Sequence, residues 1–191
     1  MSDPEIHPEQ HEKPLFLYHA SPNRQIERFE PRAERVRRPD EGPRVFATPE
    51  IASATKFMMD SDDSWVSLGQ TNGVEFAVYG DRDKFLQLDQ GGAVYVLPSE
   101  SFAVDQPDEH PDEWTSPKPV MPIEKIEYDS ALEAMLSNGV QVFFVDQATL
   151  EKVRAAAGTE EIVEVLNNLE SENKRLGRNV KIIPVVENGD E

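Results

Sequence analysis

One histidine in this sequence stands where it could bind a ligand. His19 closes the run Leu-Phe-Leu-Tyr-His at 15–19, so its ring can face a cleft while the apolar residues before it pack in a core. A structural histidine with satisfied hydrogen bonds would fit the same place. The residue type and its position therefore indicate a candidate binding residue whose role depends on its neighbours in space.

A second candidate is a group of arginines near the amino terminus. Seven of the 19 basic residues are arginines between positions 24 and 44, and the guanidinium fork suits phosphate oxygens. They are Arg24, Arg28, Arg32, Arg35, Arg37, Arg38 and Arg44. Five acidic residues share this stretch, so it is either a local anion site or a solvated loop held by ion pairs.

Several kinds of site are not expected. The chain has no cysteine, which excludes disulfides, thiolate catalysis and cysteine-bound zinc or iron. It contains no phosphate-binding P-loop, no Gly-rich dinucleotide motif and none of the familiar zinc-protease or serine-hydrolase motifs. Only His19 and His110 lie outside the first 13 residues, so we expect no metal centre built from several histidines.

Charge and hydropathy limit the location and partners. The formal charge of −18, from 37 acidic and 19 basic residues, repels phosphate backbones, so nucleic acid is not an expected partner. Adaptation to a saline cytoplasm would also explain this acidic composition. The sequence has no long uncharged apolar run and no secretory signal pattern, so we expect a soluble, cytoplasmic protein without a membrane partner.

The elements that must position these residues follow from apolar runs and turn signals. We expect a disordered tail at 1–13, a folded core at 14–128 and a helix-and-strand extension at 129–191. Expected strands are 15–19, 44–47, 74–79, 93–97, 123–128 (an edge strand), 140–145 and 180–186, with a shorter one at 84–88. The strands between 74 and 97 would form a β-meander. Five prolines at 103–122 predict an extended loop without a central strand.

Helices are expected at four places. Thr48-Pro49-Glu50 has the pattern of a helix start, with Thr48 as the cap, and this helix would run to about Met59. Its buried face would hold Ile51, Ala54, Thr55 and Met58. Three further helices are expected at 129–136, 149–157 and 159–176, the first with an Asp at its start and Gly139 beyond its end.

Three short motifs, in this order, resemble the ADP-ribosyltransferase-like fold family, in which a compact split β-sheet binds NAD. The family's strand L-Y-H-G-[ST] matches LYHAS at 17–21, and its strand-to-helix motif matches VFATPEIASATKF at 45–57. Its late Glu before a strand matches EWTSPKPVMPIEKI at 113–126. The resemblance covers roughly 15–128 and implies an α+β protein with a split antiparallel β-sheet core, flanking helices and a small C-terminal α/β extension.

The resemblance implies that NAD is bound as a substrate and gives each matched residue a role. His19 would hydrogen-bond the ribose next to the nicotinamide, and the main chain around Ala20 and Ser21 would hold the carboxamide. An aromatic ring would stack on the base. The nicotinamide pocket would be lined by Phe46, Ala47 and Thr48. Arg24 or Arg44 would grip the pyrophosphate.

The family pattern makes Glu113 the catalytic acidic residue, acting together with His19. Breaking the N-glycosidic bond builds positive charge on the ribose, which a fixed carboxylate stabilises. Other acids lie nearby, so the match could shift to Glu109 or Glu100, and a solvated loop acid is the competing interpretation of Glu113. The neighbouring Trp114 offers an apolar anchor for the loop.

Two positions depart from the family pattern. Phe46 stands where many members carry a stacking tyrosine, and simple core packing would also explain an aromatic residue there. Ala20 stands where glycine is frequent, which restricts close approach of the main chain to a ligand.

These observations support two hypotheses of different classes. The first is an NAD-dependent ADP-ribosyltransferase-like enzyme that transfers ADP-ribose to an unidentified macromolecular acceptor, such as a protein, or to water. The second is a non-catalytic interaction module that keeps the fold, such as a protein encoded by a phage or mobile element. An RNA 2'-phosphotransferase of the same fold would need a basic surface, which the net charge disfavours. An enzyme would bring His19, Thr48 and Glu113 together, whereas an interaction module would show an exposed apolar patch.

Overall fold

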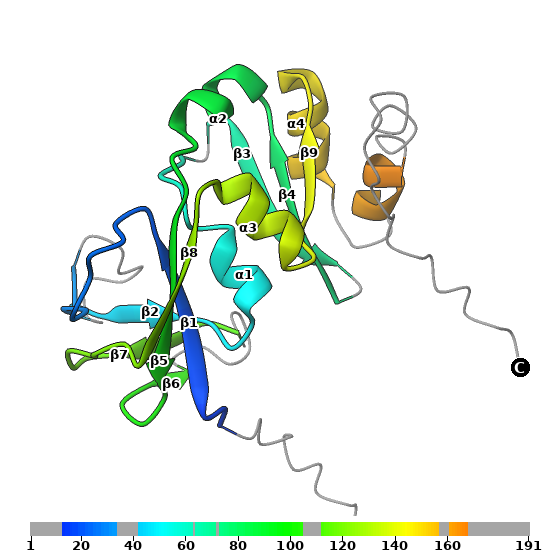
Figure 1. Cartoon of the computed structure of the whole chain (residues 1–191). Coiled ribbons are helices and arrows are strands. Elements are labelled where there is room, and N and C mark those ends of the chain that lie inside the picture. Colours follow the sequence, from blue (N-terminus) through cyan, green and yellow to red (C-terminus); the bar gives the residue numbers. More distant parts are fainter. Residues whose placement is uncertain are drawn as a thin grey trace, which may run out of the picture.

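The computed structural model describes residues 13–33, 42–62, 64–71, 73–104, 112–156 and 161–167. Within them the chain has a mixed α+β fold, with three small three-stranded sheets, mostly antiparallel, and five helices (Figure 1). The expected strand at 180–186, the end of the helix at 159–176 and nearly all of the tail at 1–13 lie outside the described residues.

The first sheet contains the strand that ends near His19. It consists of β1 (Phe16–Ser21), β5 (Gly92–Pro98) and β8 (Glu124–Tyr128) in the order β1-β5-β8, with both pairings antiparallel. Every residue of β5 except the last is buried, as its uninterrupted apolar sequence requires. The strands expected at 15–19 and 93–97 and the edge strand at 123–128 are thus confirmed.

The second sheet corrects the prediction for 103–122. It consists of β2 (Val45–Ala47), β7 (Trp114–Ser116) and β6 (Ala103–Val104), with β7 in the centre. The prolines fall on either side of β7 and none within it, so each of its residues keeps its main-chain N–H group. The prediction of a loop without a central strand was therefore wrong, whereas the strand at 44–47 is confirmed.

The third sheet replaces the expected β-meander. It consists of β3 (Val66–Thr71), β4 (Val74–Tyr79) and β9 (Gln141–Phe144), with β4 in the centre, antiparallel to β3 and parallel to β9. The meander was wrong because β5 pairs with β1 and β8 and not with β4. β3 was not predicted, although the Asn-Gly dipeptide at 72–73 is a strong hairpin signal.

The helices are α1 (Ile51–Thr55), α2 (Arg82–Leu88), α3 (Ala131–Ser137), α4 (Gln147–Ala155) and one at 161–167. The prediction of a strand at 84–88 was wrong, because this segment belongs to α2. The Asp81 side chain caps that helix by accepting a hydrogen bond from the N–H of Lys84, at 2.9 Å. Only Phe85 of α2 is buried, so one apolar anchor replaces the alternation of a strand.

The start of α1 also differs from the prediction. Thr48 does not cap the helix, because its main chain exchanges two hydrogen bonds with Tyr18 of β1, at 2.7 and 3.0 Å. The helix therefore begins at Ile51 and is shorter than expected. α3 begins after Ser130, whose side chain supplies the cap expected from Asp129.

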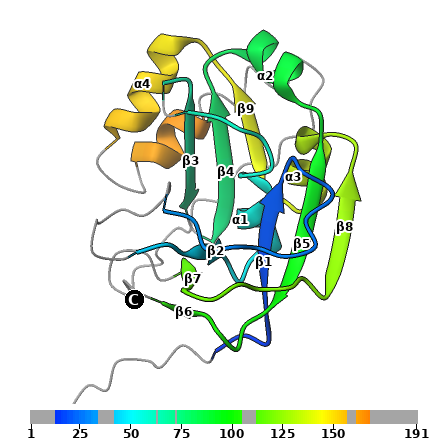
Figure 2. The ribbon, with the colours of Figure 1, turned by 90° about the vertical axis from the view of Figure 1, so that its left-hand side faces the viewer.

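Three groups of buried residues hold the sheets together. The first lies between the first and third sheets and includes Ala54 of α1, Met58 just after that helix, and Ala134 and Met135 of α3. The second joins the first and second sheets and is made by Leu17, Phe29, Val45, Ala47, Tyr95, Trp114 and their neighbours. The third lies beneath α4 and the helix at 161–167, which cover the other face of the third sheet (Figure 2). None of the helices in the described ranges is long and apolar enough to cross a membrane.

Asp89 ties the turn before β5 to the start of α3. Its carboxylate accepts hydrogen bonds from the N–H groups of Gly91 at 3.1 Å, Ala131 at 2.5 Å and Leu132 at 3.3 Å, and from the Ser130 hydroxyl at 2.7 Å. Burial raises the pKa of this carboxyl, but these donors together outweigh burial and hold the pKa below its ordinary value.

We expect Asp89→Ala to lower the free energy of unfolding at pH 7 by about 2 kcal/mol, because several buried donors lose their acceptor. The pKa of Asp89 is lower in the folded than in the unfolded protein, so its contribution is complete above about pH 4 and is lost as the pH falls through the folded value. Urea unfolding measured from pH 7 down to pH 3 should therefore show the wild type approaching the variant. Asp112→Ala, an exposed acid, is the control. A constant difference at every pH would contradict this account.

Candidate functional site

The three motifs of the sequence meet where the second sheet approaches β1. Thr48 is bridged to Tyr18, the residue before His19. Ala47 of β2 lies opposite Trp114 of β7, so Thr48 and Glu113 are the next residues along two paired strands. Segments that are far apart in the sequence therefore place the main chains of His19, Thr48 and Glu113 at one junction.

Hydrogen bonding fixes the orientation of the His19 ring. Its Nδ1 lies 2.7 Å from the carbonyl oxygen of Phe46. Because a carbonyl oxygen only accepts, Nδ1 carries the hydrogen and donates it, which makes Nε2 the acceptor of the neutral ring. The ring also packs against Phe29, with centroids 4.6 Å apart, and Phe29 in turn meets Tyr95. His19 thus has a fixed tautomer and a fixed position between β1 and β2.

The main chain of Ala20 faces the point where β1 and β2 separate. Both main-chain groups of Tyr18 point toward β2, and in a strand the groups two residues further on point the same way. Continued pairing would join Ala20 to Phe46, but among the described residues the bridge between the two strands is confined to Tyr18 and Thr48. Ala20 is only 5% exposed, and buried N–H and C=O groups are nearly always paired. The N–H and C=O groups of Ala20 are therefore suited to a ligand that offers one acceptor and one donor.

The side chains at the junction divide between two faces. Val45, Ala47 and Trp114 are buried in the second core, so alternation turns Phe46, Thr48 and Glu113 toward the opposite face. These last three side chains are half-buried. His19 lies on the core side with Phe29, so the structure brings the predicted residues together along the main chain but does not gather all their side chains on one face.

The arginines and Ser21 have partners of their own. The Arg24 guanidinium donates to three main-chain oxygens, those of Gln90, Gly92 and Tyr128. Arg44 precedes β2, is half-buried, and its main chain pairs with that of Arg32, at 3.0 and 3.1 Å. The Ser21 hydroxyl accepts a hydrogen bond from the N–H of Asn23, at 3.2 Å.

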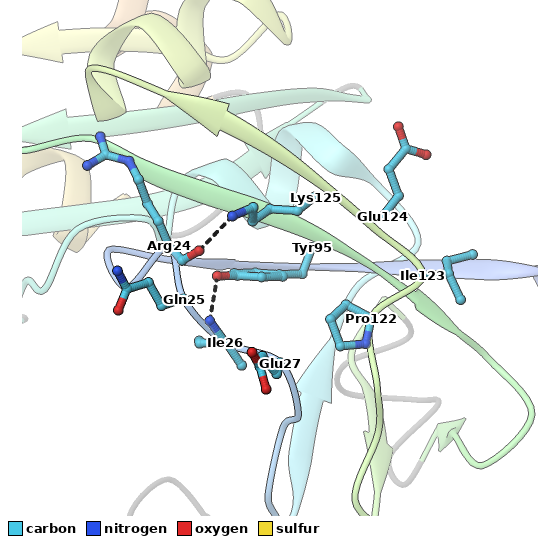
Figure 3. A pocket seen from close by; sticks show the side chains of 9 residues that line it. All are labelled: Arg24, Gln25, Ile26, Glu27, Tyr95, Pro122, Ile123, Glu124 and Lys125. Atoms are coloured by element: carbon cyan, nitrogen blue, oxygen red, sulfur yellow. Dashed lines mark hydrogen bonds between the residues drawn. The ribbon is translucent and has the colours of Figure 1, made fainter.

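A pocket of about 630 Å³ lies to one side of this junction (Figure 3). It opens between the loop after β1 and the start of β8, and Arg24 is the only predicted site residue that lines it. Its other lining residues include Ile26, Tyr95, Pro122 and Lys125. The Tyr95 hydroxyl donates to the carbonyl of Asn23 and accepts from the N–H of Ile26.

Sequence reasoning missed Phe29 and Tyr95, which support the His19 ring. Neither residue has a fixed spacing from His19 that would have marked it, because Phe29 lies on the loop after β1 and Tyr95 lies opposite His19 in the pairing of β1 with β5. In the part of the chain that the structure describes, no three His, Asp or Glu side chains gather as they would around a metal ion.

Comparison with protein-family models, with curated proteins and with solved structures finds no match in any of the three.

Proposed function

We propose that this chain is an NAD-dependent ADP-ribosyltransferase-like enzyme that transfers ADP-ribose to a macromolecular acceptor or to water. The observation that carries the proposal is the peptide unit of Ala20, buried at the point where β1 and β2 separate. A carboxamide offers an acceptor oxygen and a donor nitrogen, which complement the N–H and C=O of one residue in a strand. Nicotinamide is such a group, and the resemblance at 17–21 assigns it to this place.

The arrangement of the strands supports the same proposal. The first and second sheets touch through the bridge between Tyr18 and Thr48 and then diverge, as a split sheet does. On β2, alternation places Arg44, Phe46 and Thr48 on one face, so a cation, an aromatic ring and a hydroxyl follow one another along the strand. Arg44 would bind the pyrophosphate and Phe46 would stack on the nicotinamide. Ala47, turned to the core, would contribute only main chain.

The proposed chemistry needs one carboxylate. The bond between the ribose and the nicotinamide nitrogen breaks, its electron pair leaves with the nicotinamide, and the acceptor's oxygen or nitrogen attacks the ribose carbon and loses its proton to water. Glu113 would stabilise the positive charge that develops on the ribose. Glu113 precedes β7, which pairs with β2, so it lies across from Thr48 on the strand next to the one that carries Phe46. The resemblance gives His19 a hydrogen bond to a ribose hydroxyl, and its ring would have to receive that hydroxyl from the core side, where it packs against Phe29.

Calorimetric titration with NAD tests the proposal directly. We expect the wild type to bind NAD, and His19→Phe to bind it about tenfold or more weakly, since a ligand hydrogen bond contributes about 1.4 kcal/mol. Phenylalanine keeps a ring against Phe29, so the loss reports the missing nitrogens. Arg28→Ala is the control, because Arg28 is exposed and pairs only with Glu30 among the described residues. No heat of binding at millimolar NAD would end the enzyme hypothesis.

The non-catalytic alternative is favoured by one observation. Leu15, Met121 and Ile123 are 80%, 67% and 58% exposed. The main chains of Leu15 and Ile123 hydrogen-bond to the same end of β5, at Ser99 and Val96. Exposed apolar residues at one end of a sheet are typical of a protein-binding surface. If NAD does not bind, this end of the first sheet is where we would look for a protein partner.

A further inference from the structure

The loop after β1 contains an arginine that joins three strand ends. Arg24 Nε donates to the carbonyl oxygen of Gly92 at 3.3 Å, and Nη2 donates to those of Gln90 at 3.0 Å and Tyr128 at 2.8 Å. Gly92 begins β5 and Tyr128 ends β8, where the two residues are paired. One planar cation thus connects the loop that follows β1 to the ends of both other strands of the first sheet.

The main chains at these strand ends are packed directly on one another. A Cβ atom on Gly92 would overlap the carbonyl oxygen of Ser21 and would lie 3.0 Å from the Cα of Pro22. Ser21 follows Ala20, so a displacement of β5 at Gly92 would be transmitted to the peptide that faces β2. The Met58 side chain also reaches this point, with its Cγ 2.8 Å from the same Cβ position, but the nearest atom belongs to the main chain of Ser21, so the two strand ends touch directly.

Arg24 itself is anchored at its main chain. Its carbonyl oxygen accepts a hydrogen bond from Lys125 Nζ at 2.8 Å, and the neighbouring Asn23 carbonyl accepts one from Tyr95 at 2.7 Å. Figure 3 shows that the Arg24 side chain extends away from Pro122 and Ile123, and its guanidinium donates to the carbonyl oxygens at the strand ends. Because its main chain is held in place, Arg24 can hold the strand ends to which its guanidinium donates.

We propose that Arg24 is a positioning residue: it locks the ends of β1, β5 and β8 and thereby holds the Ala20 peptide in the geometry that receives a carboxamide. The inference rests on the proposed function for the identity of the ligand, but the lock itself is a property of the unliganded protein. It assigns to Arg24 a role different from the pyrophosphate contact that the family resemblance implies.

Fragments of NAD separate the two roles. Titration of Arg24→Ala with NAD, nicotinamide and ADP-ribose should show NAD and nicotinamide weakened by the same factor, about tenfold, and ADP-ribose unchanged. A pyrophosphate ligand would give the opposite result, with ADP-ribose weakened and nicotinamide unchanged, and that result would overturn the proposal. Arg24→Lys, which offers a point charge in place of a fork, should fall between the wild type and Arg24→Ala.

Amide hydrogen exchange tests the lock without any ligand. In Arg24→Lys we expect faster exchange at Ser21 and Ala93 than in the wild type, with exchange at Phe76 and Val78 of the third sheet unchanged. Arg28→Ala serves as the control for loss of an exposed arginine in the same loop. If the wild type binds neither NAD nor nicotinamide, the proposed function fails. Hydrogen exchange alone then decides whether Arg24 holds the ends of β1, β5 and β8. Unaltered exchange at Ser21 would show that Arg24 positions nothing.

Discussion

Replacing Glu113 by glutamine should lower the rate of nicotinamide release from NAD by about 100-fold to 1000-fold, the usual effect of removing one preorganised electrostatic group. Glutamine has the size of glutamate but cannot balance the positive charge of the ribose. NAD affinity should change by no more than a few fold, because this charge develops only in the transition state. Release of nicotinamide, followed by chromatography, gives the rate, and calorimetry gives the affinity.

Two acidic residues provide the matched controls for Glu113. Asp112→Asn changes the adjacent exposed acid and should keep the wild-type rate. Glu100→Gln tests the alternative alignment of the family motif and should also keep it. If Glu100→Gln loses turnover and Glu113→Gln does not, the catalytic carboxylate is the acid that follows β5. If both variants keep full turnover, a different residue carries the reaction.

Gly91→Ala, at the residue just before β5, should be among the most destabilising single methyl additions in the protein. Gly91 has a φ of 64°, and a Cβ there would lie 2.5 Å from the carbonyl carbon of Asp129 and closer still to the carbonyl oxygen of Tyr128. The positive φ and the overlap together should cost about 3 kcal/mol or more. The melting temperature should fall by roughly 10 °C, measured by calorimetry.

Gly73→Ala separates the two causes of that loss. Gly73 has a similar φ of 72°, but a Cβ there would meet nothing within 4 Å. This variant should therefore lose only the cost of the left-handed backbone, about 1 kcal/mol. Equal losses in the two variants would mean that the main chain of Tyr128 and Asp129 yields to a methyl group added at Gly91.

Much of the sheet structure could be predicted because it depends on local apolar runs. The runs at 74–79 and 93–97 correspond to β4 and β5, which are buried almost throughout. The errors occur where one residue decides the outcome. The alternating segment 84–88 was predicted as a strand but belongs to the helix α2, whose single buried residue is Phe85. The segment 103–122 was predicted as a loop, but β7 lies between its prolines and contains none of them. The order of the strands could not be predicted, since it depends on pairings between distant segments.

The residues of the candidate site could be proposed from the sequence, but their contacts could not. The role of His19 stays a prediction, and its ring nitrogen meets the main-chain carbonyl of Phe46, a group that every residue type presents. The arginines suggested an anion site because of their charge. Arg24 instead meets three carbonyl oxygens, which no sequence pattern records. Alternation in β2 was readable, but the face that it turns to the core depended on the pairing with β7.

The parallel pairing of β4 with β9 has a consequence for how the protein is synthesised. Residues 80–140 lie between the two strands, so the apolar strand Val74–Tyr79 leaves the ribosome well before Gln141–Phe144 can cover its second edge. During that interval the nascent chain exposes an unpaired strand edge, the kind of surface that recruits chaperones and seeds aggregates. A chain that stopped before residue 141 would keep this edge permanently. Premature termination should therefore yield an insoluble product, and not a smaller version of the same fold.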